Sequence, residues 1–90
     1  MKKRIHTFYS GRVQGVGFRF TAVEIARRLG ISGWVKNLDD GRVELVGEAN
    51  EERLEIFLAE INRYFSNYIH NVDVNWQDAT NEFKDFIIEF

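Results

Sequence analysis

The residues best suited to chemistry lie in one glycine-rich segment, residues 9–20, with the sequence YSGRVQGVGFRF. Gly15 and Gly17 allow a positive φ, so successive backbone N–H groups can turn inward around an anion. Arg19 follows directly and carries a planar fork of donors that suits phosphate oxygens. The segment therefore indicates an anion cradle, most simply for a phosphoryl group. A glycine-rich turn with a surface arginine is the alternative.

The position of this segment supports the cradle. It joins a predicted strand, residues 4–9, to a predicted helix that begins near Phe18. Amide groups at the start of a helix lack internal partners, and the helix dipole also favours an anion there. Arg12 is expected to lie beside the loop. The residues predicted to form the phosphate-binding loop are Gln14, Gly15, Val16, Gly17, Phe18 and Arg19.

Other phosphate motifs do not fit. A nucleotide P-loop needs Gly-Lys-Ser/Thr at the helix start, whereas in this chain Phe18 and Arg19 follow Gly17. The dinucleotide-binding motif needs a third glycine at the position of Phe20. The chain has no cysteine, which excludes a cysteine nucleophile, disulfides and thiolate zinc sites. Two histidines are too few for a histidine-built metal site.

Composition and charge restrict the class of protein further. With 44% hydrophobic and 29% charged residues, the chain is expected to fold as one domain over residues 1–90. The net charge of −2 argues against general nucleic-acid binding. Neither a signal peptide nor an apolar run of roughly 20 residues is present, so we expect a cytoplasmic protein that makes no contact with membranes. We also expect a monomer.

Charge is unevenly distributed along the chain. Residues 1–30 contain seven Lys or Arg and one acid, Glu24, so the remainder is strongly acidic. A positive region can steer an anionic ligand towards the glycine segment. Uneven surface charge without a function is the equally simple alternative.

Apolar periodicity and turn signals predict the elements that position this segment. Gly30 is expected to end the first helix, Asp40-Gly41 to form a hairpin turn, and Asn50 to cap the second helix. Besides the strand at 4–9, the predicted elements are a helix over 18–29, strands at 33–38 and 42–47, a helix over 51–65, and strands at 72–76 and 86–90.

This order predicts an α+β, ferredoxin-like βαββαβ sandwich. Two helices would cover one face of a mainly antiparallel sheet with strand order 4-1-3-2, and a short extra strand would follow at the C-terminus. An RNA-recognition fold shares this order, but the third strand of this chain has no aromatic residue for base stacking. Trp34, Trp76 and the phenylalanines of both helices are assigned to the core. His6 in a strand and His70 in a loop are assigned no chemistry.

Residues 11–49, GRVQGVGFRFTAVEIARRLGISGWVKNLDDGRVELVGEA, closely resemble the acylphosphatase family. The resemblance covers the glycine loop, the first helix, the Gly-Trp-Val-x-Asn strand and the Asp-Gly-x-Val hairpin. Residues 50–90 match only in their order of elements, and the chain has no proline where relatives commonly carry proline after the second helix.

The resemblance implies hydrolysis of small acyl phosphates to a carboxylate and inorganic phosphate, without a metal or other cofactor. It also implies that Arg19 and the loop amides hold the phosphate and that Asn37 positions the attacking water. Such a reaction depends mainly on positioning and charge stabilisation, and a carboxylate leaves without needing a proton. Without the resemblance, Asn37 would be interpreted as a turn asparagine.

Two other interpretations remain open. The first is a non-catalytic phosphate-binding module on the same scaffold, which would need Arg19 but not Asn37. The second is the acylphosphatase-like domain of a larger carbamoyl-transfer protein, which we do not expect because no zinc-binding cysteines follow before Phe90.

Overall fold

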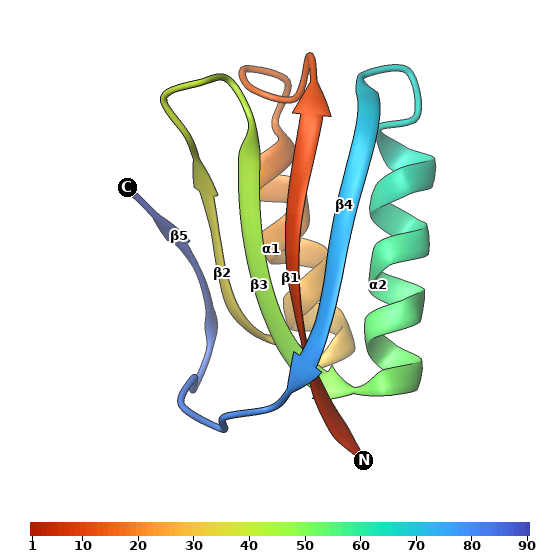
Figure 1. The fold of residues 1–90 in the computed structure, drawn as a ribbon, viewed down its shortest axis with the longest axis vertical. Helices are drawn as coiled ribbons and strands as arrows, with labels where there is room; N and C mark the ends of the chain where they lie inside the picture. The colour runs from red at the N-terminus through yellow and green to blue at the C-terminus, as the bar shows by residue number, and fades with distance from the viewer.

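The computed structural model describes residues 1–90 and shows a five-stranded sheet with both helices on one face (Figure 1). The strand order is β4-β1-β3-β2-β5, which confirms the predicted ferredoxin-like arrangement of the first four strands. The additional strand pairs in parallel with β2. In chain order the elements are β1 (Lys2–Gly11), α1 (Phe18–Leu29), β2 (Ser32–Asn37), β3 (Val43–Asn50), α2 (Glu51–Tyr64), β4 (Ile69–Asp78) and β5 (Phe86–Glu89).

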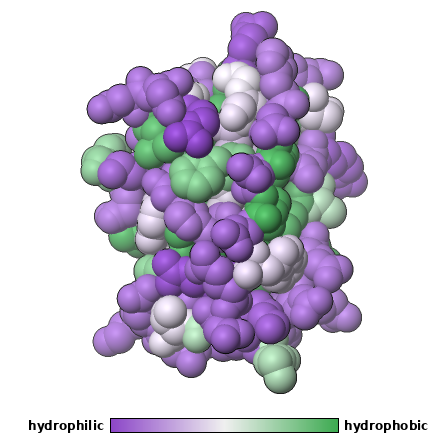
Figure 2. Space-filling view, in the orientation of Figure 1, coloured by the Kyte–Doolittle hydropathy of each residue, from purple (hydrophilic) through white to green (hydrophobic).

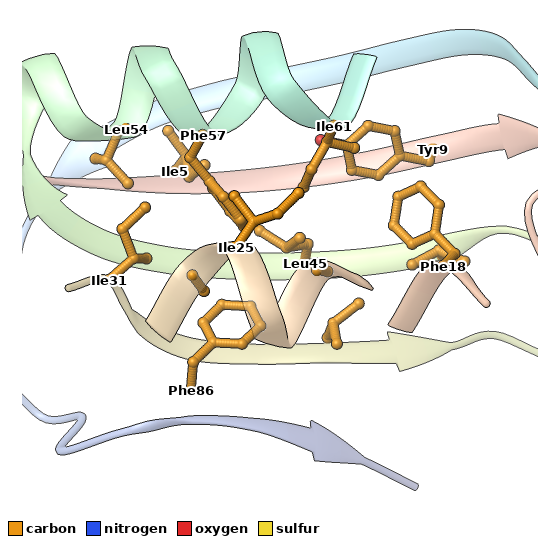
Figure 3. Close-up of a cluster of buried hydrophobic side chains, with 14 of the residues drawn as sticks. Ile5, Tyr9, Phe18, Ile25, Ile31, Leu45, Leu54, Phe57, Ile61 and Phe86 are labelled. Atoms are coloured by element: carbon orange, nitrogen blue, oxygen red, sulfur yellow. The ribbon is translucent and has the colours of Figure 1, made fainter. Parts of the chain in front are cut away.

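The core lies between the helices and the sheet. Figure 3 shows Phe57 and Ile61 of α2 and Ile25 of α1 reaching the sheet residues Ile5 and Leu45. The apolar residues predicted to recur at helical spacing face this core, although Leu29 and Leu58 among them are only half-buried. The buried residues of this set are Phe18, Ala22, Ile25, Ala26, Leu54, Phe57, Ile61 and Phe65.

The predicted helix boundaries are also confirmed. Gly30 ends α1 with a φ of 71°, and its amide donates to the carbonyl groups of Ala26 and Arg27. Asn50 begins α2, where its side-chain oxygen accepts a hydrogen bond of 3.0 Å from the amide of Arg53. Neither helix has the length and apolar character of a membrane-spanning segment.

Several aromatic assignments were wrong. Trp76 is 41% exposed because β4 lies at the edge of the sheet, and Trp34 is half-buried on the face without helices. Phe20 is 77% exposed because it follows the buried Phe18 by two positions and so projects from the opposite side of α1. His70, predicted in a loop, is the second residue of β4.

The face of the sheet opposite the helices is open. Figure 2 shows this face as mainly hydrophilic, with small hydrophobic patches between charged side chains. On this face His6 of β1 lies within hydrogen-bond distance of Glu44 of β3, with 2.6 Å between Nε2 and Oε2. His6 thus pairs with the neighbouring strand and lies on the face that carries no helix.

A buried carboxylate holds the segment that leads into β5. Glu48, on β3, is 1% exposed and accepts hydrogen bonds from the amides of Thr80 and Asn81, both at 2.9 Å. The Thr80 hydroxyl and Arg4 approach the same carboxylate at 2.8 and 3.4 Å. Burial alone would raise the pKa of Glu48, but the hydrogen bonds and Arg4 outweigh it, so the pKa lies below its ordinary value.

Replacing the Glu48 carboxylate should make the free energy of unfolding less dependent on pH. The lowered pKa means that Glu48 stabilises the folded state fully above its ordinary value of 4.5 and loses this contribution as pH falls through the folded-state value. Glu48→Gln should therefore cost about 1–3 kcal/mol of unfolding free energy at neutral pH and much less at about pH 2. Urea unfolding of both proteins at the two pH values measures this. An equal difference at both would contradict it.

Candidate active site

The connection between β1 and α1 has the backbone conformation expected of an anion cradle. Gly15 and Gly17 have φ values of 79° and 81°, whereas Val16 between them has a negative φ. This alternation turns successive N–H groups towards one side. A Cβ atom at either glycine would meet no other atom within 4 Å. Glycine is therefore required at these positions by the backbone angle and not by crowding.

The amide groups of this connection are available to a ligand. From Val13 to Phe20, no backbone N–H group donates a hydrogen bond within the protein. The flanking amides are paired, since Arg12 donates to the carbonyl of Tyr68 at 2.8 Å and Thr21 to that of Gly17 at 3.1 Å. The first turn of α1 has no side-chain cap and no acidic residue. An anion would therefore meet free donors and the positive helix end.

A cavity of about 200 Å³ opens at this connection. It brings Arg19 and Asn37, which are far apart in the sequence, to the same place as the two glycines. No acidic side chain lines it, so none competes with a bound anion. The lining residues are Val13, Gly15, Gly17, Phe18, Arg19, Phe20 and Asn37.

Arg19 is a cation without an acidic partner. The half-buried residue makes no side-chain hydrogen bond or ion pair, and its Cζ lies 5.7 Å from the centre of the Phe90 ring. Four other basic residues of the first thirty pair with acids, which leaves Lys2, Arg12 and Arg19 without an ion-pair partner. The four are Lys3, Arg4, Arg27 and Arg28. Of the three without a partner, Arg19 is the one that lines the cavity.

Asn37, the last residue of β2, lines the cavity and has an unused acceptor. Its Oδ1 atom is buried and accepts no hydrogen bond within the protein. A buried polar atom without a partner costs free energy unless water or a ligand pairs with it. The side chain is therefore suited to hold a water molecule in the cavity.

Gln14 has a role that the sequence did not indicate. Its side-chain amide donates to the carbonyl groups of Leu38 and Arg42, at 2.8 and 3.0 Å, and so points to the β2–β3 hairpin. These carbonyls lie directly beyond Asn37, so Gln14 connects the glycine loop to the strand that carries the asparagine. No local signal reveals this bond, because its partners lie 24 and 28 positions away.

Aromatic packing forms the floor beneath the loop. Phe18 is 2% exposed, and its ring centre lies 4.9 Å from that of Tyr9 and 4.7 Å from that of Phe65. Burial raises the pKa of Tyr9, so the phenol stays neutral in the core. These contacts hold the start of α1 in place.

The structure thus brings most of the predicted site residues together. Gly15, Gly17, Phe18, Arg19 and Asn37 line one cavity. The side chains predicted at positions 14 and 16 do not line it, although the amides of both positions are unpaired. The sequence analysis missed that the exposed Phe20 lines the cavity, because it assigned every helix phenylalanine to the core.

Comparisons with known proteins agree with this geometry. The family model described as acylphosphatase matches residues 5–88. An acylphosphatase of Roseiflexus sp. is 44% identical over 94% of this chain and 92% of its own length, and one of Methylococcus capsulatus is 42% identical over 96% and 95%. The crystal structure of acylphosphatase from Bacillus subtilis superposes with a TM-score of 0.89 at 31% identity, covering 98% of this chain and 99% of that one. The chain therefore belongs to the acylphosphatase family of hydrolases.

Proposed function

We propose that this protein hydrolyses the carboxyl–phosphate bond of acyl phosphates, giving a carboxylate and inorganic phosphate. One observation carries the proposal: free amides, an unpaired arginine and an unpaired asparagine oxygen converge on one cavity. Family membership supports the same reaction.

The proposed cradle consists of the loop amides and Arg19. Gln14 to Arg19 would direct their N–H groups at the phosphate oxygens, and the Arg19 guanidinium would add charged donors. In phosphoryl transfer, negative charge is spread over the three equatorial oxygens of the transition state. Preorganised donors around those oxygens stabilise that charge without having to reorient.

The proposed nucleophile is a water molecule held by the side-chain oxygen of Asn37. The water oxygen forms a bond to phosphorus while the bond from phosphorus to the acyl oxygen breaks, and its electron pair leaves on the carboxylate. The proton lost by the water goes to a phosphate oxygen, so a dianionic acyl phosphate gives a carboxylate and diprotonated phosphate, which can then release a proton to solvent. No protein general acid, metal or cofactor is needed for this step.

The size of the cavity supports small-molecule substrates. A volume of about 200 Å³ suits a phosphate group with part of an acyl group. The net charge of −2 supports a ligand other than nucleic acid.

A non-catalytic phosphate-binding module is the second candidate. It would use the loop and Arg19, as the enzyme does. Asn37 favours the enzyme, because its unpaired oxygen gives a water molecule beside the cradle an acceptor, whereas a module that only binds phosphate has no use for a water-positioning amide.

Release of phosphate from benzoyl phosphate tests the reaction directly. The protein should turn over this substrate equally well with and without a chelator. Binding of inorganic phosphate without turnover would indicate the module instead, and activity that a chelator abolishes would contradict the metal-free step.

Gly15→Ala should weaken the binding of phosphate. An alanine at this positive φ costs about 1–2 kcal/mol or forces the loop amides to turn away. The inhibition constant of inorganic phosphate should rise about tenfold. Gly41→Ala is the matched control, since its φ is 94°, its Cβ would also meet nothing, and it lies outside the cavity. Equal phosphate affinity in both variants would remove Gly15 from the cradle.

Arg19→Ala should lose both phosphate affinity and turnover, because the guanidinium contacts the ground state and the transition state alike. A loss of at least about a hundredfold in kcat/KM is expected. Arg19→Lys should also be poor, because a point charge does not replace the planar fork. Arg12→Ala is the control for general charge, since Arg12 is unpaired but lies outside the cavity. Near-normal activity of the lysine variant would exclude the bidentate contact.

Asn37→Ala should separate catalysis from binding. The inhibition constant of inorganic phosphate should stay almost constant, while turnover of benzoyl phosphate falls on the order of a hundredfold because the water is no longer held in line. The fold should remain stable, since an unpaired buried acceptor is removed. Asn75→Ala, an exposed asparagine on β4, is the control. Equal losses in affinity and turnover would make Asn37 a binding residue.

A further inference from the structure

The wall of the active-site cavity contains one apolar side chain that faces solvent. Phe20 lines the cavity and is 77% exposed, whereas the other apolar side chains of the wall, Val13 and Phe18, are 0% and 2% exposed. The exposed residues Gly15 and Gly17 present no side chain at all. Phe20 is therefore the apolar side chain that a ligand extending from the cavity into solvent would meet.

The ring of Phe20 has no aromatic or cationic partner within the protein. The aromatic pairs and the cation–π contacts of the chain all involve other rings. Phe18, two positions earlier on α1, is by contrast held between Tyr9 and Phe65. A large apolar side chain beside a polar cradle is suited to a ligand with an apolar part next to its anionic part.

The proposed reaction dictates where the acyl group lies. In-line displacement places the attacking water and the leaving oxygen on opposite sides of phosphorus. Asn37 holds the water on one side, so the acyl group must extend on the other. It cannot extend into the floor, which is filled by buried side chains. The route left to it runs outward along α1, past Phe20.

The second exposed phenylalanine at the site lies on the side of the water. Glu89 of β5 pairs with Lys36 of β2, so Phe90 comes next to Asn37. Its ring lies over the guanidinium of Arg19. Phe90 therefore contacts a residue of the cradle, and of the two rings Phe20 is the one placed to contact an acyl group.

We infer that Phe20 forms an acyl-group subsite that selects acyl phosphates with an aromatic or bulky apolar acyl group over those with a small one. This inference rests on the proposed function, because it assumes that a phosphate occupies the cradle and that the acyl group leaves in line. Phe20 determines the specificity of this subsite, while the bond-breaking step belongs to the cradle and Asn37.

The experiment compares two substrates, benzoyl phosphate and acetyl phosphate, which share the phosphate and differ in the acyl group. The parent should prefer benzoyl phosphate in kcat/KM. Phe20→Ala should lower the ratio of the two kcat/KM values roughly fivefold, because the aromatic contact is lost. Phe20→Tyr should keep the parent ratio, because it retains an aromatic ring. In both variants the inhibition constant of inorganic phosphate should equal that of the parent, which would show that the cradle is intact. Tyr64→Ala, which removes a 67% exposed aromatic ring of α2 from outside the cavity, should keep the parent ratio.

Three results would contradict the inference, and they differ in what they leave standing. If Phe20→Ala keeps the parent's ratio of kcat/KM values, including by an equal fall in kcat/KM for both substrates, the subsite is overturned. The proposed hydrolysis would remain intact. Hydrolysis of neither substrate by the parent would overturn the proposed function and the subsite with it. A ratio that falls in Tyr64→Ala as much as in Phe20→Ala would show that selectivity does not depend on the cavity wall.

Discussion

The site depends on a stretch of backbone, residues 13–20, whose amide donors stay unpaired while both of its ends are held. Backbone N–H groups are normally hydrogen-bonded in a folded protein, so the fold must keep these N–H groups away from internal acceptors. The left-handed angles of Gly15 and Gly17 aim the donors outward, and burial of Val13 and Phe18 holds the loop from below. The hydrogen-bonding capacity that a ligand would use is therefore left open by the fold.

The same constraint explains why the site draws on separate parts of the sheet. Gln14 bonds to the two carbonyls at the base of the β2–β3 hairpin, so the loop and Asn37 keep one spacing. Far from the cavity, Glu48 holds the segment that returns the chain to β2. That segment leads to β5 and the ring beside Arg19. Contacts at both ends of the sheet thus contribute to the geometry of a small site.

Much of the fold could be predicted because its signals are local. Gly30 and Asn50 mark helix ends through their own backbone and side chain, and helical stripes depend on spacing alone. The glycine loop and Arg19 were also recognisable as a possible cradle. Asn37 became a candidate only through the resemblance, because its unpaired oxygen is visible only in the packed structure. The exposure of Trp76 follows from its strand lying at an edge, which hydrophobicity does not encode.

The fifth strand makes the two edges of the sheet different. β5 covers the outer side of β2, whereas β4, with ten residues, presents a free row of backbone donors and acceptors on its outer side. An open strand of this length is a template for pairing with another chain. Asp73 lies on it without an ion-pair partner, and its charge would repel the same strand of a second molecule. This charge therefore opposes edge-to-edge pairing of two copies along β4.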